Sequence, residues 1–276
     1  MDYKRILKSR KLRIIILDFL SFIPDKMMIK IQYRIKLGRK LDLKNANRYT
    51  ERLQWLKLYY RNPVMKQCVD KYDVREYVKS KGLEGILVDC YGVYDNPQKI
   101  NWSRLPQKFV LKKTNGGGGL NVIICKDKNS LNMSEIQKIL LEWVKKNKNH
   151  SLGREWAYDG LKSRIVIDQY LENEENPQAG ISDYKLLCFH GKVKYIVLDV
   201  DRFVDHKRNI YDREWNYINI TTDHETYGDT IEKPAELEKM IEIAEKLSED
   251  FPMVRVDLFW RAYFLPVEWL CSIYTG

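Results

Sequence analysis

Four consecutive glycines, Gly116, Gly117, Gly118 and Gly119, lie between two short apolar runs, and this feature restricts the fold of the chain more than any other. Residues 109–111 precede the glycines, and residues 122–125 follow them. Both runs have the length and composition of β-strands, so the segment predicts a hairpin with a glycine tip. A P-loop and a dinucleotide-binding loop each join a strand to a helix, so neither fits this pattern.

A bare backbone at the hairpin tip suits contact with an anion. Glycine lets a backbone amide approach a phosphate with no side chain in the way, which favours a phosphate-covering flap. Lys112 ends the strand that enters the tip, where its ammonium group can reach a phosphate under the flap. The glycines alone leave open a flexible turn, and Lys112 alone leaves open a single exposed lysine.

The size and composition of the chain indicate a globular protein. With 276 residues and 44% hydrophobic content, it is long enough for one large domain or two small ones. The five cysteines form no C-x-x-C pair and no secretory signal precedes them, so we expect reduced thiols and a cytoplasmic location. The four histidines are scattered, and the sequence indicates no zinc site.

The positive charge of the chain is concentrated in residues 1–62. This region holds 17 Lys and Arg against 5 Asp and Glu, a net charge of +12, whereas the remainder carries −2. Its apolar segment 12–23 is shorter than the roughly 20 residues that span a bilayer. We expect residues 1–23 to lie on the anionic inner face of a membrane, or else to form a helix packed on its own domain. No nucleic-acid-binding motif is present.

The remaining periodicity predicts a mixed α+β fold. Helical patterns cover residues 1–62, 66–82, 133–147 and 234–251, with Ser134 as the expected N-cap of the third. The last pattern carries one apolar stripe, formed by Leu237, Met240, Ile241, Ala244 and Leu247. Strand patterns cover residues 85–94, 164–171, 184–191, 192–200 and 253–259, in addition to the hairpin.

The last strand places a cation and a carboxylate together. In "MVRVDLF" the side chains of Arg255 and Asp257 point to one face, because side chains alternate along a strand. If that face lines a cleft, Asp257 would bind Mg²⁺ and Arg255 would neutralise a phosphoryl group. A structural ion pair is the alternative interpretation.

Two further segments have competing interpretations. The backbone of Gln169, Tyr170 and Leu171 is a candidate for contact with an adenine edge, with Glu172 or Glu174 at the ribose, or it belongs to a plain strand. Asp199 and Asp201 form a D-x-D motif, with which many glycosyltransferases bind a metal and a nucleotide sugar. The motif is short, and Arg202 follows it directly, which favours a structural role.

Six stretches follow one another along the chain: "ERLQWLKLYYRNP", "DKYDVREYVKSKG", "LPQKFVLKKTNGGGG", "DYKLLCFHGKVKYI", "DRFVDHKRNIYDREWN" and "KMIEIAEKLSEDFPMVRVDLF". In sequence and in order they resemble the TupA-like branch of the ATP-grasp superfamily, which is found with bacterial cell-surface polysaccharide and teichuronopeptide biosynthesis. The resemblance implies an ATP-grasp domain over residues 63–276, preceded by the basic helical region 1–62. Two α+β subdomains, at about 108–171 and 172–276, would grip ATP between them.

The resemblance also implies the chemistry. Lys71 and Lys112 would contact ATP phosphates under the glycine flap, Lys185 would contact nucleotide or substrate, and Asp257 would bind Mg²⁺. The family reaction is ATP-dependent ligation, in which a carboxylate becomes an acyl phosphate that an amine attacks. The substrate would be a small molecule or polysaccharide precursor, such as an amino acid joined to a uronic acid polymer. A glycosyltransferase and an inactive ATP-binding remnant are the alternatives.

The chain departs from the family pattern at two places. Asp168 stands where the family usually has glutamate, which is a conservative change. After "VRVDLF" the family continues with a strand whose glutamate completes the metal site, whereas this chain reads "WRAYFLPVEWLCSIYTG". Glu268 falls 11 residues after Asp257 and is the candidate second metal ligand. We therefore expect a frameshifted or truncated end and an incomplete metal site.

Overall fold

The structure is a computed structural model that describes residues 10–117, 121–145, 153–172, 178, 181–201, 204–220, 222 and 224–259. The chain forms two compact units. One contains residues 1–66, 146–162 and 274–276, and the other contains residues 67–145 and 163–273. Each unit is described by itself below.

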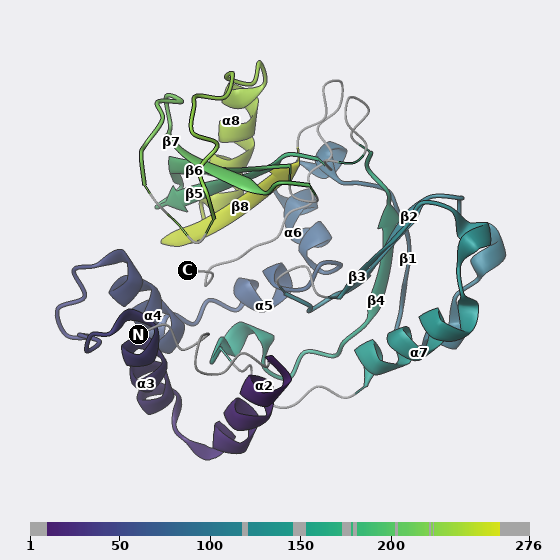
Figure 1. The fold of residues 1–276 in the computed structure, drawn as a ribbon, viewed down its shortest axis with the longest axis horizontal. Coiled ribbons are helices and arrows are strands. Elements are labelled where there is room, and N and C mark those ends of the chain that lie inside the picture. Colours follow the sequence, from purple (N-terminus) through teal and green to yellow (C-terminus); the bar gives the residue numbers. More distant parts are fainter. Residues whose placement is uncertain are drawn as a thin grey trace. The chain divides into compact units, whose positions relative to one another are not determined.

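The first unit is helical in its described part (Figure 1). Its helices are α2 (Arg10–Phe19), α3 (Asp25–Leu37) and α4 (Tyr49–Tyr59), with a 3₁₀ turn at Leu20–Phe22. A small core of Ile29, Tyr33 and Leu41 holds α3 in place. The prediction of helix throughout residues 1–62 is wrong for 38–48, because Gly38 ends α3 in the left-handed region at φ 68°.

The second unit begins its helical part with α6 (Val74–Ser80), which follows α5 (Val64–Cys68). One helix was predicted over residues 66–82, and the structure has two. The carboxylate of Asp70 accepts hydrogen bonds from the backbone N–H of Tyr72 and of Asp73, at 3.0 and 3.1 Å. This side chain therefore replaces helical backbone bonds and turns the chain between the two helices.

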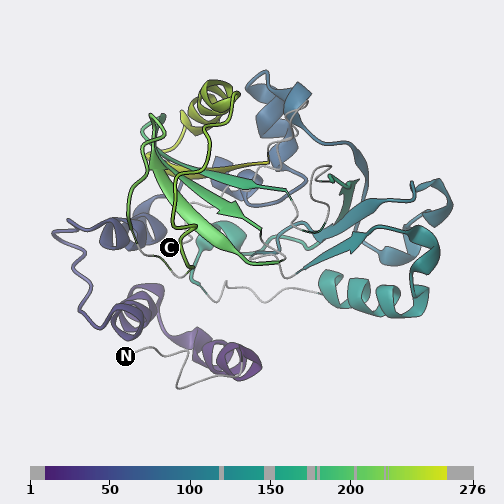
Figure 2. The same cartoon turned by 45° about the horizontal axis from the view of Figure 1, so that its top comes forward.

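The first sheet of this unit has the strand order β1-β4-β2-β3, and all neighbours are antiparallel. The strands are β1 (Cys90–Tyr94), β2 (Phe109–Lys113), β3 (Val122–Cys125) and β4 (Ile165–Gln169). The β2–β3 pairing confirms the predicted hairpin. Helix α7 (Met133–Val144) lies beside this sheet (Figure 2), and its residues Ile136, Leu140 and Trp143 belong to the same hydrophobic core as the strands. Its N-cap is Asn132, whose side chain accepts from the Glu135 N–H at 3.2 Å, so the Ser134 prediction is wrong.

The second sheet has the order β7-β6-β5-β8 and is also antiparallel. Its strands are β5 (Asp183–Phe189), β6 (Lys192–Val200), β7 (Lys207–Asp212) and β8 (Met253–Phe259). Helix α8 (Leu237–Ser248) packs on one face, and its predicted apolar stripe is fully buried. The buried residues of the sheet on the strands beneath α8 include Leu186, Cys188, Ile196, Val254 and Val256. The opposite face of this sheet is therefore left for polar side chains.

The two antiparallel sheets with packed helices confirm the α+β fold class. None of the helices in the described part of the chain is long and apolar enough to cross a bilayer.

Candidate functional site

Lys71 lies in the turn between α5 and α6 and is tied to the glycine hairpin. Its backbone N–H donates to the Thr114 carbonyl at 2.8 Å, and its ammonium group donates to the Gly116 carbonyl. Thr114 and Gly116 belong to the segment that leaves β2. The structure thus brings together the predicted lysine and the first glycine of the predicted flap.

Asp70 supports the turn that carries Lys71. Its buried carboxylate accepts from the Arg164 guanidinium at 2.9 Å, in addition to the two backbone bonds described above. Arg164 also donates to Asp73 at 2.7 Å and directly precedes β4. The turn is therefore anchored to the sheet by a charge-assisted network, and this support is independent of any ligand.

Lys112 is a buried lysine on β2. Its ammonium group donates to the Asp168 carboxylate of the neighbouring strand β4 at 3.2 Å, and both side chains are less than a tenth exposed. The second carboxylate oxygen of Asp168 lies 4.0 Å from the Arg75 guanidinium. Burial lowers the pKa of Lys112, while the negative charge of Asp168 opposes that shift.

The charge of Lys112 affects the protonation of Lys71. Burial and then the positive charge of Lys112 lower the pKa of Lys71 to about 8. An anion bound beside the two ammonium groups would relieve this repulsion, and phosphate oxygens are suitable acceptors for them. The arrangement can therefore bind a phosphate group at the start of the glycine tip.

The glycine tip itself is described in part. A Cβ atom added to Gly116 would lie 3.2 Å from the Asn121 Cβ and 3.3 Å from the Lys113 Cβ, so a side chain there would crowd the turn. A Cβ atom on Gly117 would meet nothing within 4 Å. Gly118 and Gly119 lie outside the described residues.

The segment predicted to contact the adenine edge follows Asp168 on β4. The Gln169 N–H donates to the Asp89 carbonyl at 2.8 Å, so this amide is used within the protein. Tyr170 and Leu171 follow the end of β4 and are half-buried. The contact of Gln169, Tyr170 and Leu171 with an adenine edge stays a prediction.

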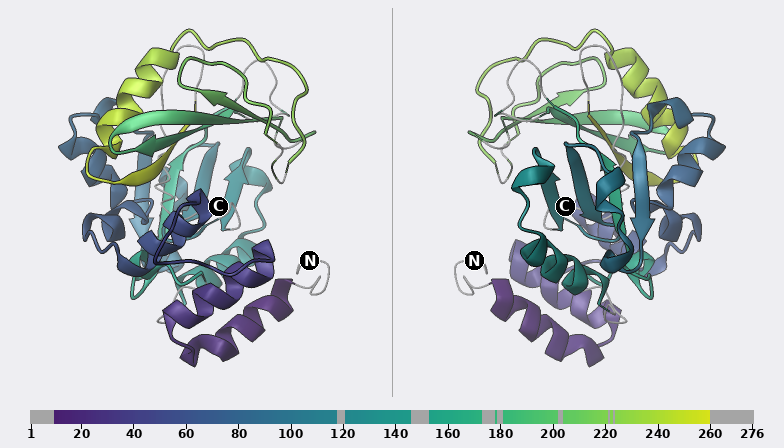
Figure 3. Two further views of the ribbon diagram at one scale, coloured as in Figure 1. Left: turned by 90° about the vertical axis from the view of Figure 1, so that its left-hand side faces the viewer. Right: turned by 90° about the vertical axis from the view of Figure 1, so that its right-hand side faces the viewer.

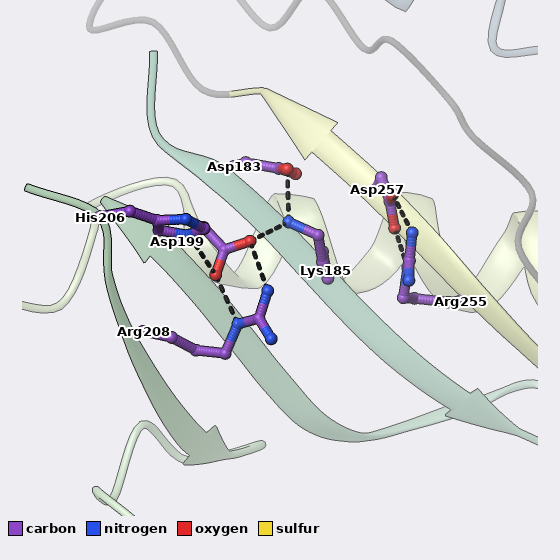
Figure 4. Close-up of polar contacts among 7 residues, drawn as sticks. All are labelled: Asp183, Lys185, Asp199, His206, Arg208, Arg255 and Asp257. Atoms are coloured by element: carbon purple, nitrogen blue, oxygen red, sulfur yellow. Dashed lines mark hydrogen bonds and ion pairs between the residues drawn. The ribbon is translucent and has the colours of Figure 1, made fainter. Parts of the chain in front are cut away.

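A second group of charged side chains covers the face of the second sheet that is opposite α8 (Figure 4). Asp199 is its buried centre: it accepts from Arg208 at 2.6 and 3.0 Å and from Lys185 at 2.6 Å. His206 Nε2 lies 3.2 Å from the same carboxylate. Burial alone would raise the pKa of Asp199, but Arg208 and Lys185 hold that pKa far below its usual range.

Lys185 connects this cluster with β8. It contacts Asp183 as well as Asp199, and on the other side it lies opposite Asp257 in the β5–β8 register. Arg255 binds Asp257 through two hydrogen bonds of 2.6 Å each, which confirms that both side chains share one face of the strand. Burial raises the pKa of Asp257 to about 6, against the opposing effect of Arg255. Lys185, Arg255 and Asp257 are thus brought together.

The described residues do not by themselves form a magnesium site. Both carboxylate oxygens of Asp257 are taken up by Arg255, and no group of three or more His, Cys, Asp or Glu side chains in the described part of the chain could hold a metal. Glu268, the predicted second ligand, lies outside the described residues. The assignment of Mg²⁺ to Asp257 and Glu268 therefore stays a prediction.

The D-x-D motif does not present two carboxylates on one strand face. Asp199 is in β6, whereas Asp201 lies beyond the end of this strand with a left-handed φ of 51°. Arg202 lies outside the described residues, and the cations that neutralise Asp199 are Lys185 and Arg208. This geometry gives the glycosyltransferase interpretation no support.

Two charged clusters have now been described, one around Lys71 and Lys112 and one around Asp199. Several of their residues were not identified from the sequence as site residues. They are Asp70, Arg75, Arg164, Asp183, His206 and Arg208. His206 and Arg208 lie in or next to β7, a strand that the sequence pattern did not reveal. In β7 burial alternates along the strand, and the two buried residues are Asn209 and Tyr211. One of these two inward positions is therefore a polar amide. That alternation is the signal that could have found the strand.

Comparison with known proteins places most of the chain in one family. The family model described as TupA-like ATPgrasp matches residues 51–263. The search of curated proteins gave no match.

Similar solved structures include three kinds of enzyme. D-alanine–D-alanine ligase from Bacillus anthracis has 19% identity and a TM-score of 0.46, with 73% of this chain and 55% of that chain covered. N5-carboxyaminoimidazole synthetase from Staphylococcus aureus, complexed with ADP, has 14% identity and a TM-score of 0.48, with 84% and 52% covered. The ATP-grasp ligase PsnB, complexed with its minimal precursor, has 10% identity and a TM-score of 0.46, with 82% and 60% covered. The chain thus spans little more than half the length of these proteins.

Proposed function

The chain belongs to the TupA-like ATP-grasp family, and on this premise we propose that it is an ATP-dependent carboxylate–amine ligase. Family membership supports ATP binding. The observation that carries the proposal is the pair of lysines at the glycine hairpin, the half-buried Lys71 and the buried Lys112. Lys71 contacts the Gly116 carbonyl, and its pKa is lowered to about 8 by burial and by Lys112. Such a pair is suited to the phosphates of a nucleotide.

In the proposed reaction an oxygen of a substrate carboxylate attacks the γ-phosphorus of ATP, and ADP leaves. The amine of a second substrate then attacks the carbonyl carbon of the acyl phosphate, inorganic phosphate leaves, and the amine loses a proton. Protein groups contribute by positioning and by charge neutralisation, because phosphoryl transfer needs little covalent help from the enzyme. Lys71, Lys112 and the tip amides would bind the nucleotide phosphates.

The charged face of the second sheet would serve the acceptor. Lys185 and Arg255 are mostly buried cations, exposed by 11% and 15%, so their charges act in a medium where electrostatic interactions are stronger than in water. Both are paired with carboxylates here, and an incoming acyl phosphate would compete for them. The acceptor class that we propose is the uronic acid carboxylate of a cell-surface polysaccharide precursor, joined to an amino acid. This class comes from the resemblance to the teichuronopeptide branch.

Turnover with both substrates tests the proposal. The intact protein is incubated with ATP and Mg²⁺, oligogalacturonate and a panel of amino acids, and ADP release is measured. We expect ADP release that needs both the carboxylate and the amine. With ¹⁸O in the acceptor carboxylate, one labelled oxygen per turnover should appear in inorganic phosphate.

Matched variants locate the reaction. Lys185→Met and Arg255→Met should slow ADP release by at least tenfold, whereas Lys194→Met, an exposed lysine on β6, should leave it unchanged. ADP release without ¹⁸O transfer would contradict the acyl phosphate step. ATP binding without turnover on any acceptor of this class would favour the inactive remnant, and consumption of a UDP-sugar would favour a glycosyltransferase.

A further inference from the structure

Helix α2 and the turn after it present a row of exposed apolar side chains. Leu12, Ile15, Phe19 and Phe22 are spaced three, four and three residues apart, which places them on one side of a helix. Their exposed fractions are 45%, 63%, 76% and 75%. The rings of Phe19 and Phe22 meet edge to face, with their centroids 6.4 Å apart. Two large aromatic side chains therefore lie together in water.

Helix α3 repeats this arrangement next to basic side chains. Met27, Ile31 and Ile35 recur every four residues with exposed fractions of 56%, 40% and 49%, while Met28, Ile29 and Tyr33 are buried. Lys30 and Arg34 are also exposed, and their helical spacing puts them beside the apolar row. An apolar row flanked by cations is typical of helices that lie in a membrane interface.

The junction between the two helices is held by the fold. The buried Arg154 donates to the carbonyls of Leu20 and Ser21 at 2.9 and 3.2 Å and to the carboxylate of Asp25 at 3.0 Å. These bonds fix the segment between α2 and α3 within the first unit. Figure 3 shows α2 and α3 as two separate helices in purple. The exposed apolar side chains are thus presented by an anchored element.

The net charge of residues 1–62 indicates which kind of surface binds the exposed apolar side chains of α2 and α3. Residues 1–62 carry a net charge of +12, and Lys4, Arg5 and Lys8 stand directly before α2 in the sequence. A second copy of the chain would bring the same positive charge to the contact. A bilayer with anionic lipids offers an apolar layer for the phenylalanines and negative headgroups for the lysines and arginines.

We propose that the exposed face of α2 and α3 docks on an anionic membrane surface without crossing it. The apolar side chains enter the boundary between headgroups and acyl chains, and Lys30 and Arg34 lie at the level of the lipid phosphates. This inference is independent of the ligase chemistry, because none of these residues belongs to either charged cluster of the second unit.

Vesicle flotation of the full chain tests the proposal. Phosphatidylcholine vesicles with and without 30% phosphatidylglycerol are compared at low and high salt. We expect binding to the anionic vesicles that falls as salt is raised. Phe19→Ser with Phe22→Ser should lower binding by at least tenfold. Lys30→Gln with Arg34→Gln should lower it by up to about fivefold per residue, from about 1 kcal/mol for each cation near the surface.

Controls separate docking from general effects. Val204→Ser with Tyr227→Ser removes two other apolar side chains, exposed by 69% and 51%, and Lys126→Gln with Lys138→Gln removes exposed lysines, all in the second unit. These variants should bind as the parent chain does, and circular dichroism should show that every variant is folded. Equal binding of the Phe19/Phe22 variant and the parent would overturn the proposal. It would also be overturned by a dimer that the same variant abolishes while no vesicle binding occurs, since the face would then be a contact between copies.

Discussion

The ammonium group of Lys71 is suited to binding a phosphate, but its charge lowers the stability of the ligand-free folded chain. Its pKa is lowered in the folded chain from 10.5 to about 8, so the unfolded chain takes up this proton first as pH falls. The resulting penalty on the folded state is full below pH 8 and vanishes above about pH 10.5. We therefore expect the contribution of Lys71 to stability to rise as pH increases between these values.

Lys71→Met should accordingly stabilise the ligand-free protein at pH 7 by about 1–2 kcal/mol, a value reduced for the partial exposure of the side chain. Urea unfolding at pH 7 and at pH 10 measures the effect, which should shrink at the higher pH. Lys71→Arg keeps the charge at both pH values and serves as the control. A Lys71→Met variant that is less stable than the parent at pH 7 would show that the ammonium group is not under electrostatic penalty.

Asp168 carries the charge that compensates the buried Lys112. Asp168→Asn should destabilise the fold by about 2–4 kcal/mol, because it leaves a buried ammonium group with less negative charge beside it. The double variant Asp168→Asn with Lys112→Met should lose much less than the sum of the two single variants. Additive losses in urea unfolding would mean that the two side chains are not coupled.

The candidate site residues could be named from the sequence, whereas the residues that contact them could not. Lys71, Lys112, Lys185, Arg255 and Asp257 stand in short patterns that can be read along the chain. Their partners depend on strand pairing between distant segments: Asp168 meets Lys112 only because β4 pairs with β2. Single-sequence periodicity does not contain this register.

At the level of secondary structure, glycines at helix ends are the most sensitive points of the helical part. Gly82 follows α6 at φ 68°, a left-handed conformation that an L-residue adopts at a cost. Gly82→Ala should therefore destabilise the protein by about 1 kcal/mol in thermal or urea unfolding. Gly85 lies three residues on, without positive φ and with nothing within 4 Å of an added Cβ. Gly85→Ala is the matched control and should change stability by less than about 0.5 kcal/mol, and equal losses in both variants would refute the assigned cause.

Helices and strands with a strong apolar periodicity were predicted well. Helix ends and strands that depend on polar side chains were not. The predicted apolar stripe of α8 is buried, and Val254, Val256 and Leu258, which the alternation of β8 places on one face, are buried too. The break between α5 and α6 depends on the Asp70 side chain, which competes with backbone bonds and leaves the apolar spacing intact. Strand β7 was not predicted because one of its two buried positions is the polar Asn209, and its half-buried positions include the charged Lys207, Arg208 and Asp212.

The whole molecule combines a chain of the ATP-grasp family with a basic helical region that has an exposed apolar face. The charge asymmetry between residues 1–62 and the rest is visible in the sequence, and the exposure of Phe19 and Phe22 is visible only in the structure. The second sheet also combines features of both kinds. The sequence shows that Arg255 and Asp257 share one face, and only the structure shows that the Asp199 cluster lies beside them.

Isothermal titration of the protein with ATP and with UDP-glucose, in the presence and absence of Mg²⁺, measures whether the chain is an ATP-binding protein. We predict that ATP binds, that UDP-glucose does not, and that Lys112→Ala weakens ATP binding by about 1–3 kcal/mol, the range for a hydrogen bond to a charged group. Lys126→Ala, an exposed lysine just after β3, should leave the affinity unchanged. Binding of UDP-glucose without binding of ATP would contradict the account, and so would an ATP affinity that Lys112→Ala leaves unaltered.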